Sequence, residues 1–408
     1  MNEINKNREV DSTARVRGKS VYIKTMGCQM NIRDSEVVSG ILQKAGYLLL
    51  EDKEDADILI FNTCSVRQHA EDKVWSEIGS IAKRYSLSTK RHPKRSKPLI
   101  GIIGCMAQNY QDQIFERSPA VDFVVGPTDI DKIPAILKKL TEKKSDLFKV
   151  KVWETDGEIR PEDIYHAGFY EDKEHCYVVI SEGCSNYCTY CVVPYVRGKL
   201  HNRDYKEILQ EIEQAVDNGI TKVTLLGQNV NAYCSPVTLP GHQPTVNFIE
   251  LLKSVNGISG LKEFSFITSH PRDTAVELFR AMAECDKLKK NLHLPVQSGS
   301  DKILKSMSRG YTRKFYLDLV DNYRKIVKGG GLTTDIIVGF SGETKDDFQD
   351  TFDLVKAVRF DAAYIFKYSP RPNTEALKWP DDVPKDEKER RHALILDLQK
   401  KISKEKKC

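Results

Sequence analysis

Short apolar runs alternate with segments of helical periodicity along most of the chain. In its first part, each run is bounded by Gly, Asn or Cys, and a helical stretch follows it. These runs are Val21–Met26, Asp57–Thr63, Pro98–Gly104 and Asp122–Gly126. A βαβα order of this kind predicts a parallel sheet with helices on its faces. We therefore expect an N-terminal α/β domain over residues 20–140.

The same alternation starts again after a polar, poorly periodic segment. Residues 141–172 predict a linker with one short strand inside Lys149–Glu154. The apolar runs of the second series are Cys176–Ser181, Lys222–Gly227, Glu263–Thr268, Asn291–Val296, Thr333–Phe340 and Ala363–Ser369. Helical segments such as Tyr205–Asn218 and Lys314–Lys328 separate them. Six βα units predict an open, partial (β/α)6 TIM barrel over residues 173–408, which ends in a basic amphipathic helix over Lys385–Glu405.

The composition is that of a folded protein. Among 408 residues, 40% are hydrophobic and 30% are charged, whereas disordered chains contain far fewer apolar residues. No apolar run reaches the roughly 18 residues of a transmembrane helix, so no membrane association is expected. The net charge of +5 permits a nucleic-acid partner without favouring one, and DNA binding is not expected.

The cysteine content adds candidate chemistry. Residues 1–19 lack the apolar segment of a secretory signal and are expected to form a disordered leader. We therefore expect a cytoplasmic protein, in which thiols stay reduced. Ten cysteines in such a chain indicate metal binding or catalysis rather than disulfides.

The strongest candidate site is the barrel trio, Cys184, Cys188 and Cys191, which begins three residues after the first strand of the second series. Loops at the carboxyl ends of barrel strands carry the chemistry in such folds. Structural zinc sites usually have four ligands, and no fourth cysteine is adjacent here. Three thiolates can instead hold three irons of a 4Fe–4S cluster and leave one iron open to a chelating ligand, for this spacing typically S-adenosylmethionine. Zinc and unconnected structural cysteines are the alternatives.

A second group, the N-terminal trio, consists of Cys28, Cys64 and Cys105, each of which follows a predicted strand of the first series. The carboxyl ends of parallel strands lie at one edge of a sheet, so we expect these thiols to converge. The glycines before Cys28 and Cys105 allow a tight turn beside a bulky ligand. Taken singly, each cysteine also fits a buried apolar side chain.

The segments around these cysteines resemble the radical S-adenosylmethionine (radical SAM) methylthiotransferase family. They read SEGCSNYCTYCVVPYVRG, LLGQNVNAY, TSHP, LHLPVQSGSD and TDIIVGFSGET. The resemblance extends from Val21 to about His392, and Leu225–Tyr233 looks like the MiaB type, which acts on tRNA.

The resemblance implies an enzyme that adds a methylthio group to carbon 2 of an isopentenyl-modified adenosine in the tRNA anticodon loop. It also implies two 4Fe–4S clusters, S-adenosylmethionine and an external electron donor. The barrel-trio cluster would generate a deoxyadenosyl radical, and the cluster of the N-terminal trio would carry the sulfur. An unactivated aromatic C–H has no acidic proton, so the cofactor has to supply the radical.

Polar residues at strand ends are weaker candidates for contacts with S-adenosylmethionine. They are Tyr190, Gln228, Asn229, Gln297, Ser298 and Gly299. Tyr190 could place its backbone against the adenine, and the others could hydrogen-bond a ribose or an aminoacyl group. Turn chemistry alone also places polar residues at such positions.

Other polar and thiol residues have simpler interpretations. His270 and His293 are expected to be structural, and Arg197 could meet a carboxylate or a phosphate. The cysteines not expected to be ligands are Cys176, Cys234, Cys285 and Cys408.

The chain departs from the family pattern at a few positions. Ser341 stands where Pro is usual, Asn373 stands where Gly is common, and Lys199–Arg203 lacks the usual acidic residue and Ser-Arg. Most members end in a small RNA-binding barrel, the TRAM domain, and we expect none after the last helix.

A basic stretch over Ala82–Pro98 holds seven Lys or Arg residues and no acid. It predicts either a solvated loop or a phosphate-binding surface for tRNA. The first candidates for phosphate contacts are Lys90, Arg91, Lys94 and Arg95.

Three other functions stay open on the sequence. The same chemistry could act on threonylcarbamoyladenosine. A two-cluster electron-transfer protein is disfavoured because such carriers gain from fully ligated irons. A bare RNA-binding module is disfavoured by the mild net charge and the lack of an RNA-binding signature.

Overall fold

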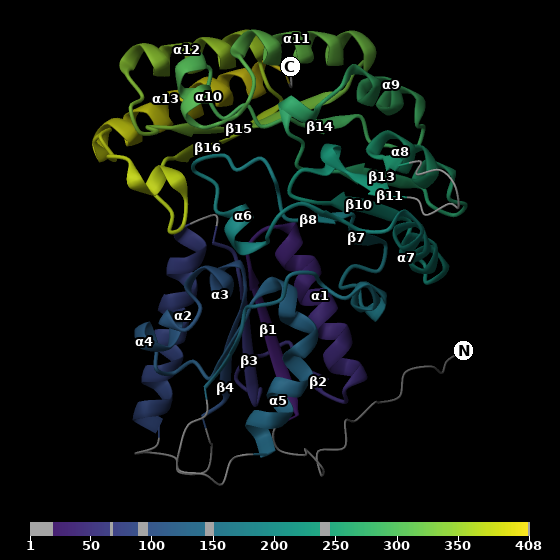
Figure 1. Cartoon of the computed structure of the whole chain (residues 1–408), viewed down its shortest axis with the longest axis vertical. Coiled ribbons are helices and arrows are strands. Elements are labelled where there is room, and N and C mark those ends of the chain that lie inside the picture. The colour runs from purple at the N-terminus through teal and green to yellow at the C-terminus, as the bar shows by residue number, and fades with distance from the viewer. Residues whose placement is uncertain (1–18, 66–67, 89–96, 143–150, 237–244, 407–408) are drawn as a thin grey trace, which may run out of the picture.

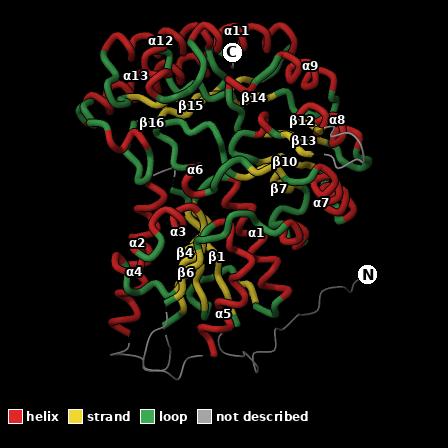
Figure 2. The backbone as a smooth tube through the Cα atoms, in the orientation of Figure 1, coloured by secondary structure: helices red, strands yellow, loops and turns green. Residues whose placement is uncertain are grey.

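The strands form two parallel sheet systems, which lie one above the other in Figure 1. The computed structural model describes residues 19–65, 68–88, 97–142, 151–236 and 245–406. The lower system in Figure 2 belongs to the N-terminal part of the chain, and the upper system belongs to the remainder. The predicted α/β class, with a parallel N-terminal sheet and a partial barrel, is confirmed.

The N-terminal sheet has six parallel strands in the order β2-β1-β3-β4-β5-β6. Their bounds are β1 Ser20–Met26, β2 Leu48–Leu49, β3 Ile58–Thr63, β4 Leu99–Gly104, β5 Phe123–Val125 and β6 Val152–Glu154. Each apolar run of the first series became a strand. The short strand predicted inside Lys149–Glu154 is β6, which pairs with β5 through Phe123 and Val152, so the sheet extends into the segment that we interpreted as a linker.

Helices cover both faces of this sheet. They are α1 Gln29–Lys44, α2 Gln68–Ser88, α3 Cys105–Tyr110, α4 Gln113–Arg117, η1 Pro127–Lys132 and α5 Ile133–Glu142. In β3, Ile58 and Ile60 pack with α1 and α5, whereas Leu59 and Phe61 pack with α2 and α3. The strand is buried along its whole length, as expected for a parallel strand between two helical layers.

The second system consists of two three-stranded parallel sheets, β7-β10-β13 and β14-β15-β16. A parallel bridge between Phe264 and Leu288 joins them, which gives the open barrel. The strands are β7 His175–Val179, β10 Lys222–Leu226, β13 Glu263–Phe266, β14 Asn291–His293, β15 Gly331–Val338 and β16 Ala362–Lys367. Two antiparallel pairs complete the strands: β8 Ser181–Glu182 with β9 His201–Asn202, and β11 Cys234–Pro236 with β12 Thr245–Asn247.

Helices surround the barrel strands on the outside (Figure 1). The longer ones are α7 Tyr205–Asp217, α8 Phe248–Gly257, α9 Val276–Glu284, α11 Arg313–Ile326, α12 Lys345–Val358 and α13 Lys385–Glu405. The short ones are α6 Val193–Val196, α10 Asp301–Ser306, η2 Glu162–Ala167, η3 Val230–Ala232, η4 Pro271–Asp273 and η5 Glu375–Lys378. In the described ranges, no helix combines the length and apolar character that crossing a membrane requires.

Buried charges join the two sheet systems. Asp34 on α1 accepts hydrogen bonds from Arg160 at 2.8 Å and from Arg197 at 2.6 Å. Burial raises the pKa of Asp34, but the two guanidinium groups hold it below its ordinary value. One residue earlier on α1, Arg33 pairs with Glu211 of α7 at 2.9 Å. Helix α1 is therefore tied to the barrel by charges that are removed from water.

The Asp34 cluster predicts a large loss of stability on substitution. Asp34→Ala leaves two buried guanidinium groups without their shared carboxylate, and breaking a buried pair typically costs about 3–5 kcal/mol. The free energy of unfolding in urea should fall by that amount. As a control, Glu142→Ala removes an exposed partner of Lys138 at 3.9 Å, which should cost less than about 1 kcal/mol. Equal, small losses in both variants would contradict the role given to Asp34.

Candidate active site at the junction of the two sheets

The barrel trio lies in the loop between β8 and α6. The loop leaves β8 through Gly183, which has a φ of +71°. A Cβ added there would lie 2.2 Å from the Lys199 carbonyl oxygen, so this position requires glycine. Thr189 fixes the middle of the loop, because its hydroxyl donates to the Ser306 carbonyl at the end of α10 at 2.9 Å. Cys188 is buried, and the other two thiols are partly buried.

The thiols of the barrel trio are close enough to affect one another electrostatically. Burial and then the charge of Cys188 raise the pKa of Cys191 to about 12. Burial also raises the pKa of Cys184, with a smaller contribution from Cys188. Binding of an iron–sulfur cluster would therefore displace the protons from these thiols, since metal ligation requires the thiolate.

The N-terminal trio lies at one edge of the first sheet. Cys28 caps α1 after β1, Cys64 follows β3, and Cys105 begins α3 after β4. A hydrogen bond with Cys64 is the largest effect on Cys28 and lowers its pKa to about 6. Burial raises the pKa of Cys105, and the charge of Cys28 adds to that shift. The structure thus brings together the three thiols that the parallel topology predicted to converge.

Glycine permits the close turns beside this trio. Gly104 has a φ of +87°, and a Cβ added there would lie 2.4 Å from the Asn62 side-chain oxygen. A Cβ added at Gly27 would lie 2.4 Å from the Asn31 side-chain oxygen. Both turns therefore exclude a side chain, as the sequence predicted.

The two trios lie next to one another at the junction of the sheets. Cys105 packs in one apolar cluster with Val192 and Val196, and Val192 directly follows Cys191 in the chain. Arg197 crosses the same junction: its Nε donates to the Cys105 sulfur at 3.3 Å, and its Nη2 donates to Asp34 at 2.6 Å. Helices α3 and α6 meet there (Figure 1). The predicted carboxylate partner of Arg197 is therefore Asp34.

The donor set fits iron–sulfur clusters. Among the described residues, no group of three or more His, Cys, Asp or Glu side chains is suited to a single metal ion. A four-iron cluster is larger than one ion, and its thiolate ligands stand correspondingly farther apart. Each trio offers three reduced thiols without a disulfide, which matches three irons of a cluster with one iron left open.

Buried polar atoms without partners gather at the ends of the barrel strands. Among the described residues, they include the side-chain oxygens of Gln228, Asn229, Gln297 and Ser269 and the Nε2 of His270. Buried polar groups are normally hydrogen-bonded, and exceptions call for an explanation such as an absent ligand. Three of the predicted S-adenosylmethionine contacts therefore have free hydrogen-bonding capacity.

The other predicted contacts are engaged within the protein. The Ser298 hydroxyl lies 3.2 Å from the Thr351 hydroxyl, and the Gly299 N–H donates to Thr351 at 2.9 Å. These two residues fasten the strand end to α12. The ring of Tyr190 packs edge-on against Phe340.

His270 has one structural nitrogen and one free nitrogen. Its Nδ1 accepts the Arg272 N–H at 3.2 Å, at the start of η4. Burial, followed by the charges of Arg309 and Arg272, lowers the pKa of His270 to about 2. The neutral ring therefore carries its proton on Nε2, which is buried without a partner. The structural role predicted for His270 uses only Nδ1. The Nε2–H remains as a donor without a partner.

Arg309 is a site residue that sequence reasoning missed. It is 4% exposed, and its Nη1 lies 3.5 Å from the Cys188 sulfur. It follows α10 in the segment MSRGYT, where no spacing relates it to the cysteines. Only the packing of α10 against the barrel-trio loop, seen in the Thr189 hydrogen bond to Ser306, brings the two together.

Other predictions have simpler outcomes. His293 bonds the Thr333 hydroxyl at 2.9 Å through Nδ1, in keeping with a structural role. Cys176 and Cys285 are buried, and Cys234 is exposed in β11. The basic candidates Lys90, Arg91, Lys94 and Arg95, and also Cys408, lie outside the described residues.

The departures from the family pattern have local explanations. Asn373 has a φ of +66°, which favours glycine and which asparagine tolerates better than most residues. Its side chain donates to Asn109 at 3.0 Å. The Ser341 hydroxyl donates to the Pro380 carbonyl at 2.7 Å. Asn202 donates to the Cys234 carbonyl at 2.9 Å.

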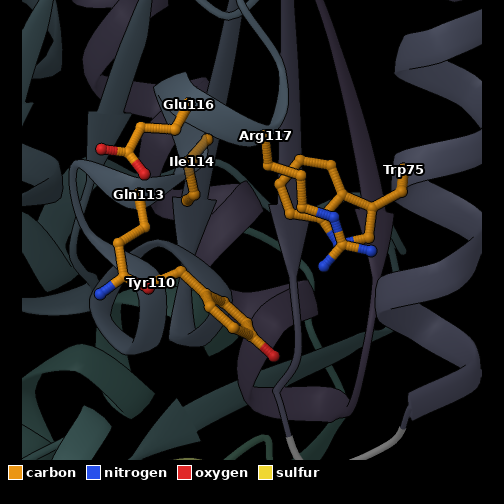
Figure 3. A pocket seen from close by; sticks show the side chains of 6 residues that line it. All are labelled: Trp75, Tyr110, Gln113, Ile114, Glu116 and Arg117. Carbon is orange, nitrogen blue, oxygen red and sulfur yellow. The ribbon is translucent and has the colours of Figure 1, made fainter.

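A surface pocket on the N-terminal part of the chain is separate from these groups (Figure 3). Its lining residues are Trp75, Tyr110, Gln113, Ile114, Glu116 and Arg117. The Arg117 guanidinium lies 4.3 Å from the centre of the Trp75 ring, in a cation–π contact. None of the predicted site residues lines this pocket.

Similar proteins identify the class first. Residues 178–355 match the radical SAM superfamily, and residues 20–126 match the uncharacterized protein family UPF0004. Among solved structures, the chain is similar to the radical S-adenosylmethionine methyltransferase TsrM from Kitasatospora setae, with a TM-score of 0.56 and 11% identity over 88% of this chain and 77% of that one. It is also similar to the radical enzyme OxsB, with a TM-score of 0.53 and 14% identity over 95% of this chain and 56% of that one. The fold is that of a radical SAM enzyme.

Closer relatives identify the family. The chain is 43% identical to the tRNA-2-methylthio-N(6)-dimethylallyladenosine synthase of Carboxydothermus hydrogenoformans, over 94% of this chain and 84% of the relative. It is 40% identical to the protein of the same name from Clostridium botulinum (strain Langeland), over 100% of this chain and 86% of the relative. The chain belongs to the family of the tRNA-2-methylthio-N(6)-dimethylallyladenosine synthases.

The state of His270 can be measured directly. Its lowered pKa predicts that the ring stays neutral, with the proton on Nε2, between about pH 5 and 8. An ordinary histidine changes charge near pH 6.5. Nitrogen NMR of protein labelled on histidine, compared with His270→Gln for assignment, should show one unchanging neutral ring. A transition of the His270 signal near pH 6.5 would contradict this environment.

Proposed function

We propose that this protein is an enzyme that adds a methylthio group to carbon 2 of isopentenyl-modified adenosine beside the tRNA anticodon. The observation that carries the proposal is the junction itself, where Cys105 of one trio packs against the residue that follows Cys191 of the other. The names of the relatives give the same activity. The cytoplasm, where tRNA is modified, is the proposed location.

Each trio would hold one 4Fe–4S cluster. The barrel-trio cluster together with S-adenosylmethionine would supply the radical, and the cluster on the N-terminal trio would supply the sulfur. The protein's own part is to hold both groups at one junction and to exclude water around them. Burial of Cys188 and Cys105 keeps water away from the two groups. The ion pairs around Asp34 hold the junction together.

The strand ends would bind S-adenosylmethionine. The unpartnered side-chain oxygens of Gln228, Asn229 and Gln297 are acceptors for ribose hydroxyls or an ammonium group. The Nε2–H of His270 is a donor for an acceptor on the same ligand. Tyr190, Ser298 and Gly299, predicted as further contacts, would then act through their backbone, since their side chains are packed or absent.

The adenosine has to reach both trios. A base in the anticodon loop is already partly unstacked, which lowers the cost of turning it out. A low-potential one-electron carrier would deliver the electron. Threonylcarbamoyladenosine as the substrate is not favoured by the relatives' names, and an electron-transfer role is not favoured by three thiols per site.

Paired cysteine variants test this division of labour. Cys188→Ala removes a ligand of the barrel trio and should abolish deoxyadenosine formation from S-adenosylmethionine. Cys64→Ala removes a ligand of the N-terminal trio and should leave deoxyadenosine formation in place while methylthiolated tRNA disappears. Both products are measured by mass spectrometry in single-turnover reactions with isopentenylated tRNA.

The matched control is Cys285→Ala, which removes a buried thiol that follows α9 and should retain both products. Deoxyadenosine at the unsubstituted level from Cys188→Ala would contradict the proposal. Methylthiolated tRNA from Cys64→Ala would contradict the role of the N-terminal trio.

The S-adenosylmethionine site is tested by Gln297→Ala. Losing one hydrogen bond to the ligand costs about 0.5–1.5 kcal/mol, so the dissociation constant should rise about two- to tenfold. Equilibrium dialysis of the reconstituted protein measures it. Gln399→Ala on α13 is the control, since this glutamine also has a buried oxygen without a partner, and affinity should not change. Equal affinities in both variants would remove Gln297 from the site.

A further inference from the structure

Each cysteine trio has one buried guanidinium group against one of its sulfurs. Arg197 donates from Nε to the Cys105 sulfur at 3.3 Å. Arg309 donates from Nη1 to the Cys188 sulfur at 3.5 Å. Hydrogen bonds to ligand sulfurs and nearby net charge are among the factors that set the reduction potential of an iron–sulfur cluster. The two arginines are therefore comparable features at the two proposed cluster sites.

The charges of the two arginines are balanced differently. Arg197 pairs with Asp34 at 2.6 Å and lies 3.7 Å from Glu182. Arg309 donates instead to neutral oxygens, the Tyr311 hydroxyl at 3.1 Å and the Pro295 carbonyl at 2.8 Å. Within the part of the chain that the structure describes, no carboxylate pairs with Arg309. An unpaired buried charge is costly, so an anionic group is required beside it.

The backbone holds Arg309 in this position. Ser308 before it has a φ of +55°, and Gly310 after it has a φ of +71°. Non-glycine residues with positive φ are strained and tend to occur at functional sites. The Tyr311 hydroxyl lies 2.8 Å from the Val296 carbonyl, to which it donates. The strained backbone of this turn therefore holds the Arg309 guanidinium group in place beside Cys188.

We propose that Arg309 is a positioning residue whose unbalanced charge stabilises the reduced form of the barrel-trio cluster. An incoming electron would therefore go to this cluster rather than to the cluster on the N-terminal trio. The inference rests on the proposed function. Reduction adds one negative charge to the cluster, and a nearby cation favours that state. One electron leaves a low-potential one-electron carrier, which is oxidised, and enters the cluster. At the other site, the two carboxylates of Asp34 and Glu182 balance the two guanidinium groups of Arg197 and Arg160.

Redox potentiometry of the reconstituted protein tests this inference. Cys64→Ala is the background, because it leaves one cluster to observe, and the reduced state is followed by EPR. Adding Arg309→Gln should lower the ratio of reduced to oxidised cluster at a fixed potential about tenfold, as expected from the loss of one hydrogen bond to a charged group. For a one-electron couple this is a midpoint about 59 mV lower.

Two further variants control for geometry. Arg309→Lys keeps the charge, so its midpoint should stay closer to that of the background than the midpoint of Arg309→Gln does. Arg313→Gln removes an arginine that pairs with Asp350 at 3.0 Å on the outside of the barrel and should leave the barrel-trio midpoint in place. A midpoint unchanged by Arg309→Gln would overturn the inference. An unchanged midpoint with weaker S-adenosylmethionine binding would assign Arg309 to the carboxylate of that ligand and would also overturn it.

A second measurement needs no substitution at Arg309. Pulsed EPR of the reduced cluster in Cys64→Ala protein, grown with arginine labelled with nitrogen-15, should detect a coupled nitrogen-15 nucleus. Its absence would overturn the inference even if Arg309→Gln failed to hold iron. Failure of the proposed function is distinct, because the unsubstituted protein would then form no deoxyadenosine at all.

Discussion

The carboxylate of Asp34 and its two guanidinium partners hold the halves of the active site together. Asp34 lies on α1, whose N-cap is Cys28, so one helix carries both a proposed cluster ligand and the anchor to the barrel. Arg197 links that anchor to the Cys105 sulfur. Buried ion pairs contribute little net stability against an apolar alternative, but breaking one is costly. The arrangement therefore fixes how the two sheets face each other.

The rest of the site depends on this orientation. The radical chemistry would begin at the barrel trio, and the sulfur would come from the N-terminal trio, so the substrate carbon has to lie within reach of both. A rotation between the sheets would separate Cys105 from Val192 even if each trio kept its own cluster. Asn373, a departure from the family pattern, adds a second tie, because it donates to Asn109 of α3. Asn109 in turn donates to Ser65, next to Cys64.

Sequence patterns predicted the features that depend on periodicity and topology. The apolar runs became the barrel strands and most of the N-terminal sheet, and the parallel order placed Cys28, Cys64 and Cys105 at one edge. The two edge strands differ in this respect. β2 has only two residues, Leu48–Leu49, and was not predicted, whereas β6 is the short strand predicted inside Lys149–Glu154.

The residues around the trios could not be predicted in the same way. Arg309 lies far from Cys188 in the chain, and only tertiary packing brings its charge to the sulfur. The second nitrogen of His270 is also a tertiary feature, since the local sequence explains its capping role alone. Conversely, the Ser298 hydroxyl and the Gly299 N–H are engaged with Thr351 of α12, and their contacts with S-adenosylmethionine stay a prediction. Strand-end position predicts which residues are near a site. The hydrogen bonds that each side chain already makes within the protein show which of them are available to a ligand.

In the proposed active site, two clusters lie together at one junction. EPR of the fully reduced, reconstituted protein tests it most directly, because two paramagnetic clusters at a shared site interact magnetically. If the clusters share this junction, the spectrum of the unsubstituted protein differs from the sum of the spectra of Cys64→Ala and Cys188→Ala, each of which would hold one cluster. A spectrum equal to that sum would contradict a shared site.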